Sequence, residues 1–598
     1  MSIVSLKKVT LYGTVKEKGL ILQRLQKLGC MHLVPLNKHS LRPDSIGFVQ
    51  PEKAHKALRY LSDAPKKRRF ITDVNSFHVE EVVNRTLANQ SRTSQAVDER
   101  DSLLKRIQEV EPWGDFTFLS LDELSGIRLW FYIVPCAKMK QLVSVELPWH
   151  VVHSDQRNQY VVVLSKEEPN SAALPAPRIH TGALPLSELR KQLNDVEIEL
   201  EDLAAERESL TRWILLLTKS LVSAENQASL AMATHETLDI ETFFAVQGWV
   251  SVHDVKRVAD FAGRRDLAIL VESPQPTDCP PTLLDNPKPL SGGQEMVYFY
   301  QAPGYRTWDP SVIVFFSFAM FFAMIMSDAG YAALLGLILL FYRKRMGQSE
   351  KGQRLRMMGT AITAVSVVYG VLAGSFFGHS PAEGSFLKFF HIIDINDYQS
   401  MMRLSVVVGA LHIVTANVVM AWRQRNSLTA LGSVGWVVIL LSGLVLWIAD
   451  TESAIFSTGK WTVVAGLLFV FLFSSERPLK KPADILWRIA HGLIALTNLS
   501  KAFGDVLSYM RLFALGLAGT SLAVTFNQLA VSTAEAIPGI GLLVSLLILV
   551  LGHTLNFALA VMSGVVHGMR LNFIEFYTWG ISEEGYPFKP FSKKEIKL

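Results

Sequence analysis

The sequence predicts a protein in two parts: cytoplasmic α/β lobes joined by an antiparallel coiled-coil arm, followed by an α-helical membrane domain with eight transmembrane helices. Up to about Arg306 the 598-residue chain is rich in charged residues, whereas from Trp308 onward it consists of long apolar runs. Several of these runs approach the ~20 residues that a helix needs to cross a bilayer. Before the boundary, leucines recur with the spacing of a coiled coil. We therefore expect residues 1–306 to form a cytoplasmic arm and residues 307–598 to form the membrane domain.

The first residues predict a small α/β lobe at the base of the arm. The stretch KKVTLYGTV alternates like a strand, KEKGLILQRLQKLG has helical spacing and ends at Gly29, and CMHLVPL reads as a second strand. Residues 6–36 therefore predict a β-α-β unit. No glycine-rich phosphate loop stands at its turn, which favours an ordinary structural role. We assign residues 1–60 and 236–306 to this base lobe.

A heptad pattern predicts the arm itself. Apolar residues alternate at 3-4 spacing, interrupted once by Arg207. They are Leu186, Leu189, Leu193, Val196, Leu200, Leu203, Leu210, Ile214 and Leu217. A weaker partner pattern runs through Val83, Leu87, Val97, Leu104 and Ile107. We expect an antiparallel coiled coil over about 61–111 and 181–235, with a distal α/β lobe over about 112–180, and such an arm suggests a strut or docking element.

Composition argues against several other classes of function. The formal net charge of +5 is small and lies mostly in loops that flank the apolar runs, so it gives no sign of nucleic-acid binding. Cys30, Cys136 and Cys279 show neither metal-ligand spacing nor a disulfide framework, so we expect no metal or cofactor and a reducing cytosol around the N-terminal half. No apolar core follows the first lysines, as a signal peptide would require. No P-loop is present, so ATP chemistry must belong to another chain, and whether this chain counts as an enzyme stays open.

The apolar runs predict eight membrane spans. They cover residues 309–326, 329–342, 357–378, 403–422, 431–449, 460–475, 484–532 and 538–580. Only the residues SDAG separate the first two runs, so together these could form one long helix. The basic loops YRKRMGQSEKGQRLRMM, WRQRN and ERPLKKPADILWR fall on one side if the chain turns near Asp328. By the positive-inside rule that side is cytoplasmic, and an even number of spans places both termini there.

Charged residues inside the last two spans are the strongest functional signal. Near a bilayer centre an arginine costs about 2.5–3.5 kcal/mol on insertion scales, and Arg511 cannot avoid this cost by losing its proton. At 100° per residue, polar and small residues share the face of Arg511 within about 60°. They are Thr497, Ser500, Gly504 and Ser508. On the eighth span Asn556, Ser563, His567 and Arg570 likewise lie within about 60° of one another.

Two interpretations of these arginines stay open. Each is either a flanking or structural charge, paired with Asp505 or Glu575, or it serves a function that needs a permanent cation. The small residues beside Arg511 would let another helix approach closely. A cation that faces such an opening holds a passing carboxylate deprotonated, because an opposite charge within ~4–6 Å lowers the pKa of a carboxyl group.

Several motifs closely resemble subunit a, also called subunit I, of V-type and A-type rotary ATPases. They are GDVLSYMRLFALGLAG, HTLNFALAVMSGVVHGMRLNFIEFY with GYPFKPF, MFFAMIMSDAGYAALL, GVLAGSFFG and PPTLLDNPKPL with YFYQAPGYRTWDPS. The resemblance implies a stator whose last two helices are long and tilted and face a rotating ring of c subunits, with Arg511 as the essential ring-facing arginine and Arg570 as its partner. The chain departs from eukaryotic members at Gly519 and Ala560, where these often carry a histidine and an acid. Its short soluble part resembles prokaryotic members, which implies the plasma (inner) membrane of a prokaryote.

The resemblance also implies two offset half-channels for H⁺ or Na⁺ that couple ion flow to ATP hydrolysis or synthesis. The implied cytoplasmic residues are Asn498, Ser500, Asp505 and Glu575, the implied outer residues are Asn527, Gln528, His553 and Asn556, and Ser508, Ser563 and His567 are further candidates. Implied partners are the c ring, peripheral-stalk E/G-type subunits, a central-stalk d/C-type subunit and the V1/A1 ATPase sector, besides the lipid bilayer. The alternative is a secondary transporter, which predicts internal repeats and broken helices, or a membrane-anchored scaffold, which does not explain two arginine-bearing faces.

Overall fold

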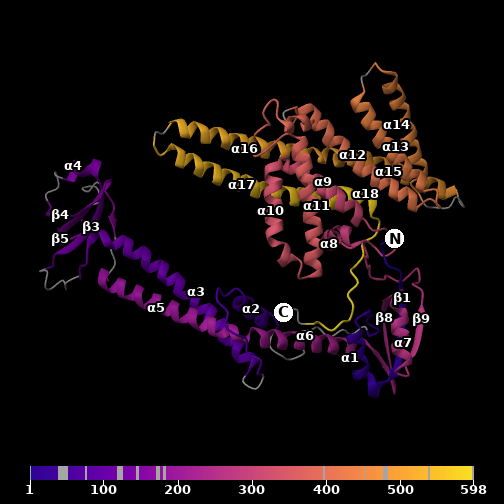
Figure 1. Ribbon diagram of the computed structural model, residues 1–598, viewed down its shortest axis with the longest axis horizontal. Helices are drawn as coiled ribbons and strands as arrows, with labels where there is room; N and C mark the ends of the chain where they lie inside the picture. The colour runs from indigo at the N-terminus through magenta and orange to yellow at the C-terminus, as the bar shows by residue number, and fades with distance from the viewer. Residues whose placement is uncertain are drawn as a thin grey trace. The chain divides into compact units, whose positions relative to one another are not determined.

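The chain folds into two compact units (Figure 1). The computed structural model describes residues 2–37, 51–73, 77–117, 126–142, 147–169, 176–179, 184–394, 397–449, 452–475, 482–536 and 539–595. The first unit comprises Met1–Tyr12, Cys30–Val34 and Val246–Pro590, and the second comprises Gly13–Gly29, Pro35–Ala245 and Phe591–Leu598. Part of a predicted strand (118–125) and of a predicted basic loop (476–481) lies outside the described residues. The boundary predicted at residue 306 stays a prediction.

Two long helices lie side by side in the second unit, α3 (Val79–Val110) and α5 (Leu186–Leu210) (Figure 1). Ion pairs join Arg85 to Glu206 at 2.9 Å and Arg92 to Glu199 at 2.7 Å. Because the partner numbers fall on α5 as they rise on α3, the two helices are antiparallel. Helices α2 (Pro51–Ser62) and α6 (Ile214–Glu236) pack at one end of this pair. The coiled-coil arm as a functional element remains a prediction.

The seam between α3 and α5 shows one error in the sequence prediction. On α5 the predicted Val196 and Leu203 are buried, but on α3 Leu104 is 41% exposed and Leu103 packs in its place. The predicted partner pattern was therefore wrong by one residue in this stretch. The same seam contains a polar position, because Asn89 is 1% exposed and donates from Nδ2 to the carbonyl of Leu203 at 3.0 Å.

A four-stranded antiparallel sheet in the second unit follows the order β4-β5-β3-β6. Its strands are β3 (Arg128–Pro135), β4 (Trp149–Ser154), β5 (Asn158–Ser165) and β6 (Arg178–Ile179). Alternate residues of β3 and β5, such as Trp130, Tyr132, Val161 and Val163, form its small core together with Leu142 of the short helix α4 (Met139–Leu142). The sheet lies within the predicted distal lobe.

The predicted β-α-β elements of residues 6–36 are confirmed as β1 (Leu6–Thr14), α1 (Lys18–Leu28) and β2 (Met31–Val34). Helix α1 ends at Gly29, whose φ of 65° is the left-handed conformation that glycine adopts without strain. The two strands are not neighbours, since the sheet order is β2-β8-β1-β9. Strands β8 (Phe243–Ser251) and β9 (Ala268–Glu272) flank α7 (Val255–Gly263), and β7 (Leu238–Ile240) pairs with the start of β8.

The rest of the first unit is helical from α8 (Ser291–Tyr300) onward. Six segments among the described residues are long and apolar enough to cross a membrane. They are α11 (Glu350–Leu372), α12 (Tyr398–Arg423), α13 (Ala430–Ile448), α14 (Ala454–Phe473), 484–536 and 541–580. The helices predicted as the first two spans are α9 (Ser311–Met326), of 16 residues, and α10 (Ala329–Met346), whose last turn carries three basic residues. Whether these two also cross, giving eight spans, stays a prediction.

The turn between α9 and α10 is built around Asp328, so the two runs do not form one helix. Ser327 has a φ of 47°, and the Asp328 carboxylate accepts hydrogen bonds from Ser375 Oγ at 2.6 Å and from the amides of Tyr331, Phe377 and Gly378 at 3.0 Å each. A carboxylate with four donors is well satisfied although it is 2% exposed. The Asp328 carboxylate thereby links the turn to the loop that follows α11.

Helix α9 occupies the centre of the helical unit. Its residues are apolar on all sides and most are buried, among them Phe318, Phe321 and Phe322. It packs against α8, α11, α16 (Met510–Ala536) and α17 (Gly541–Arg570). A helix that is hydrophobic all round is expected to be enclosed by other elements, and α9 is enclosed on most sides, although Phe316 is 59% exposed.

The two last spans contain irregularities that the sequence did not predict. The seventh span is two helices, α15 (Pro482–Ser508) and α16, joined at Tyr509. In the eighth, α17 passes into the π-helix η8 (Leu571–Phe576) and then into α18 (Tyr577–Gly580). At the joint Tyr509 is completely buried, and a Cβ added to Gly409 of α12 would approach its Cγ to 2.4 Å. Glycine at 409 therefore allows the tyrosine to pack against α12.

We expect the seam of α3 and α5 to distinguish Leu203 from Leu104. Leu203→Ala removes a buried side chain and should lower the opening free energy of this helix pair by about 2–4 kcal/mol, whereas Leu104→Ala, at an exposed position, should change it by less than about 0.5 kcal/mol. Amide hydrogen exchange of α3 and α5 in the purified full-length chain measures both. Equal acceleration in the two variants would contradict the seam described here.

Candidate functional site

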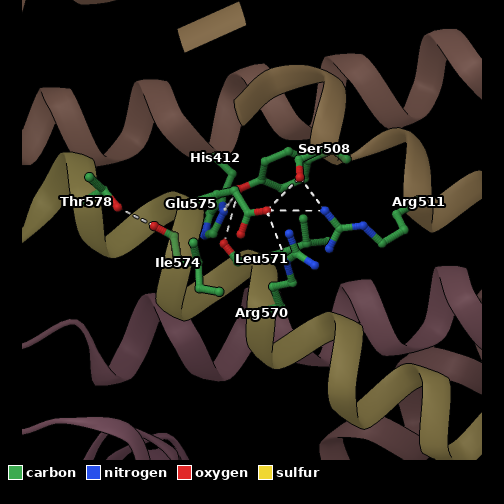
Figure 2. A network of polar contacts seen from close by, with 9 residues as sticks. His412, Ser508, Arg511, Arg570, Leu571, Ile574, Glu575 and Thr578 are labelled. Carbon is green, nitrogen blue, oxygen red and sulfur yellow. Dashed lines mark hydrogen bonds and ion pairs between the residues drawn. The ribbon is translucent and has the colours of Figure 1, made fainter. Parts of the chain in front are cut away.

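The predicted arginine of the seventh span meets the predicted glutamate of the eighth at the joint between α15 and α16 (Figure 2). Ser508 Oγ donates to Glu575 Oε1 at 2.6 Å, and Arg511 Nη2 lies 3.3 Å from the same oxygen. Arg511 also donates to Ser508 Oγ. Arg570 Nε approaches Glu575 Oε1 to 3.9 Å from the end of α17. One carboxylate oxygen is thus shared by a hydroxyl and two guanidinium groups.

Burial is uneven across this cluster. The side chain of Glu575 is 3% exposed, that of Arg511 is 21% exposed and that of Arg570 is 52% exposed. Burying one charge is costly unless an opposite charge accompanies it, so Glu575 and Arg511 stabilise each other here. Glu575 Oε2 and Arg511 Nη1 are both buried and have no hydrogen-bond partner among the described residues. The pair therefore contains one buried acceptor atom and one buried donor atom that no described residue satisfies.

The two irregularities position the pair. A π-helical turn inserts an extra residue into a helix, which redirects the side chains on it, and such turns are frequent at functional sites. Glu575 lies on η8, and Asn572 of the same turn accepts from Ser317 Oγ of α9 at 2.5 Å. At the other side, Tyr509 places its hydroxyl 2.8 Å from Nδ1 of His412 in α12. The joint two residues before Arg511 is thereby anchored to a neighbouring helix.

Asp505 is not the partner of Arg511. Its Oδ2 accepts a hydrogen bond from Nε1 of Trp579 at 2.7 Å, and no ion pair between Asp505 and an arginine occurs among the described residues. Of the two acidic partners that the sequence left open for the arginines, the structure brings Glu575 to Arg511.

A second polar cluster joins α10, α16 and α17. His553 Nε2 lies 2.9 Å from Asn527 Oδ1, and His553 Nδ1 lies 2.7 Å from the hydroxyl of Tyr331. Asn556 Nδ2 donates to this hydroxyl at 3.0 Å and to the carbonyl of Gly519 at 2.8 Å. Asn527 Nδ2 donates to the carbonyl of Phe377 at 2.8 Å, so the amide oxygen of Asn527 is the acceptor and His553 carries its proton on Nε2. The hydroxyl of Tyr331 thus contacts both His553 Nδ1 and Asn556 Nδ2 and links the two side chains.

The remaining predicted residues do not join either cluster. Asn498, Ser500 and Gln528 are exposed, and Ser563 and His567 are half-buried. His567 Nδ1 is buried without a partner among the described residues. The structure therefore groups Ser508, Arg511, Arg570 and Glu575 at one place and Asn527, His553 and Asn556 at another.

Sequence reasoning missed four aromatic residues that build these clusters. They are Tyr331, His412, Tyr509 and Trp579. Each lies in a predominantly apolar segment, where a buried hydroxyl, imidazole or indole needs a hydrogen-bond partner. That need is a signal in the sequence that could have identified them. Tyr331 and Tyr509, for example, lie within three residues of Asp328 and Arg511 in the quoted motifs.

Comparison with known proteins relates the whole chain to one kind of subunit. No family model matches the sequence. A V-type ATP synthase subunit I of Borreliella burgdorferi is 25% identical, with 99% of each chain covered. One of Chlamydia pneumoniae is also 25% identical, over 88% of this chain and 87% of the relative. The chain is a homologue of V-type and A-type ATP synthase subunit I.

Other relatives extend this homology to archaea. An A-type ATP synthase subunit I of Methanocaldococcus jannaschii is 25% identical over 68% of this subunit I homologue and 63% of the relative. Among solved structures, the cytoplasmic N-terminal domain of subunit I, a homologue of subunit a of V-ATPase, aligns with 44% of this chain and 99% of its own length at 18% identity. Its TM-score of 0.22 is too low to bear on the fold.

The polar cluster around Tyr331 should contribute measurably to stability. Tyr331→Phe leaves His553 Nδ1 and an Asn556 proton without their partner and should lower the free energy of unfolding by about 1–3 kcal/mol. Tyr369→Phe is the matched control, because the Tyr369 hydroxyl is buried without a partner among the described residues. Thermal unfolding of the purified chain in detergent compares them. A drop in Tyr369→Phe as large as that in Tyr331→Phe would contradict the hydrogen-bond network.

Proposed function

We propose that this chain is the stator subunit a/I of a V/A-type rotary ATPase and that it couples H⁺ or Na⁺ translocation across the membrane to ATP hydrolysis or synthesis. The observation that carries the proposal is Arg511, a permanent cation in a candidate span, one-fifth exposed and paired with the buried Glu575. The homology to subunit I over nearly the whole chain supports it. The c ring, the peripheral-stalk E/G-type and central-stalk d/C-type subunits and the V1/A1 sector are the proposed partners.

Arg511 acts on carboxylates that the ring brings past it. A guanidinium within ~4–6 Å lowers the pKa of a carboxyl group and so forces release of its ion before the carboxylate moves on. The guanidinium, whose side chain is 21% exposed, donates to the incoming carboxylate, while Nη2 also contacts Glu575 and Ser508. Glu575 then serves as the resting counter-ion, which keeps the guanidinium oriented when no ring carboxylate is opposite.

The two polar clusters are the two half-channel entries. The one at Glu575, with Asn498, Ser500 and Asp505 on α15, belongs to the cytoplasmic half-channel. The one at Asn527, His553 and Asn556, with Gln528 beside it, belongs to the outer half-channel. Arg511 and Asn527 are 16 residues apart on α16, which is about 24 Å along a helix at 1.5 Å per residue. This offset, together with the fixed positive charge of Arg511 in the first cluster, prevents ions from passing straight through.

Arg570 has a supporting role in this proposal. It lies 3.9 Å from Glu575 and is half exposed, so it adds positive charge near the pair without being confined by it. Ser563 and His567 precede Arg570 on the same helix and lie on the same face of it. The antiparallel α3 and α5 helices are proposed to dock the stalk subunits, which transmit torque to the stator.

Arg511→Ala should abolish ATP-driven ion uptake by the reconstituted complex while ring and ATPase subunits remain present in normal amounts. Arg511→Lys should also be severely impaired, because a lysine is a flexible point charge that cannot span two acceptors as a guanidinium does. Arg570→Ala and Glu575→Gln should reduce uptake without abolishing it.

Arg345→Ala is the matched control for these measurements, since Arg345 is an exposed arginine at the end of α10. Ion uptake and subunit content are measured on the same preparations. Full uptake in Arg511→Ala complexes that still contain the ring would refute the role given to this arginine. Loss of the ring from those complexes would instead assign Arg511 to assembly.

The proposed topology places both termini in the cytoplasm of a prokaryotic cell. In a chain with Cys30, Cys136 and Cys279 replaced by serine, a cysteine at Gln348 should react with an impermeant maleimide only from the cytoplasmic side. A cysteine at Glu383 should react only from outside. Inverted and right-side-out vesicles measure the two sides, and labelling of both positions from one side would show that α11 does not cross.

A further inference from the structure

An open cavity of about 430 Å³ lies at the end of α12, within the first unit and far in sequence from the site at Arg511. The N-terminal residues, the segment before α9 and the residues after α12 form its walls. Its polar lining includes Ser5, Arg306, Arg423, Arg425 and Asn426, and Trp422 stands at its side. Neither the half-channels nor the proposed stalk contacts use this cavity.

The lining carries three arginines and no carboxylate. Arg423 donates from Nη1 to the carbonyl of Thr307 at 2.6 Å and from Nη2 to the carbonyl of Arg306. Arg306 in turn donates from Nη1 to the carbonyl of Pro276 at 2.8 Å. Carbonyl oxygens orient these guanidinium groups but do not neutralise their charge.

The positive charge of the cavity is not compensated nearby. Among the described residues no carboxylate lies within 4.0 Å of any of the three arginines, the limit that defines an ion pair. Asp278 acts on Arg306 from farther away, but its own carboxylate pairs with Lys8 at 3.1 Å. The cavity therefore favours an anion, and the hydroxyl of Ser5 and the amide of Asn426 add neutral donors to it.

The position of the cavity on α12 indicates where that anion comes from. Helix α12 is a candidate membrane span of 26 residues that ends at Arg423. Trp422, just before this end, is 71% exposed, and the guanidinium of Arg425 lies 5.9 Å from its ring centroid. Tryptophan and arginine at the end of a span lie at the level of the lipid headgroups. Basic pockets at that level bind anionic headgroups.

We propose that this cavity binds the phosphate headgroup of an anionic phospholipid. Arg425 and Asn426 contact the phosphate, Arg423 and Arg306 supply charge from the wall, and the exposed ring of Trp422 packs beside the glycerol and the first methylenes of the acyl chains. The bound lipid would tie the N-terminal residues to the loop after α12. This inference needs α12 to cross the bilayer but does not need the stator function.

Native mass spectrometry of the full-length chain in detergent tests the proposal. Phosphatidylglycerol should be retained in preference to phosphatidylcholine, and millimolar inorganic phosphate should neither bind nor displace it. Arg425→Ala should weaken retention of phosphatidylglycerol about fivefold, the effect expected for one basic residue near an anionic lipid. Arg425→Lys should restore most of it, and Arg345→Ala, an exposed arginine outside the cavity, should not change it.

The results distinguish a phospholipid site, a site for a soluble anion and the absence of a binding site. Equal retention of the two lipids, or equal loss in Arg425→Ala and Arg345→Ala, would overturn the proposal. Competition by inorganic phosphate at millimolar concentration would overturn the lipid and identify a site for a soluble anion. Loss of transport in Arg511→Ala with intact lipid selectivity would leave this inference standing, so it fails separately from the proposed function.

Discussion

The arrangement of the last two spans depends on one ion pair inside the helical unit, that of Arg511 with Glu575. A guanidinium cannot lose its charge, so the helix that carries Arg511 must offer it an acceptor wherever the helix is shielded from water. Glu575 is that acceptor, and it is itself almost completely buried. Removing Glu575 would leave Arg511 without its acceptor, and removing Arg511 would leave Glu575 with only the half-exposed Arg570 at 3.9 Å. The joint at Tyr509 and the π-helical turn of η8 are the local departures that bring the two side chains together.

These departures are stabilised by packing around them. Tyr509 is held by the hydroxyl contact with His412 and by the space that Gly409 leaves in α12, and its ring meets the edge of Phe321 in α9. The π-helical turn is held from the other side by Ser317 of α9. The central helix α9 therefore contacts both irregular segments. In this way an apolar helix without charged residues helps to position the charged residues of the site.

Sequence patterns predicted the elements well where their physical cause is local. Periodicity found the β-α-β elements, the helices of the arm and the apolar helices, and the energetic cost of a buried arginine identified Arg511. The partner pattern on α3 was wrong by one residue at Leu104, and the seam also contains Asn89, a satisfied polar residue that no hydrophobic period reveals. A straight 100° projection grouped Ser508 with Arg511 on the seventh span and His567 with Arg570 on the eighth, but it treats each span by itself. The contact with Glu575 depends on two interruptions of the helices, and these arise from tertiary contacts of Tyr509 and Asn572 that the sequence alone does not specify.

The burial of α9 has a consequence for how the protein is made. Its 16 residues give a helix of about 24 Å, shorter than the ~30 Å hydrocarbon core, and its partners α16 and α17 begin about 200 residues later in the chain. At 5–20 residues per second those partners emerge about 10–40 s after α9. During that interval Phe321 and Phe322 lack the neighbours that enclose them in the finished fold, and lipid or the insertion machinery must shield them. The helix at the centre of the structure is thus synthesised before most of its surroundings and is among the last to be enclosed.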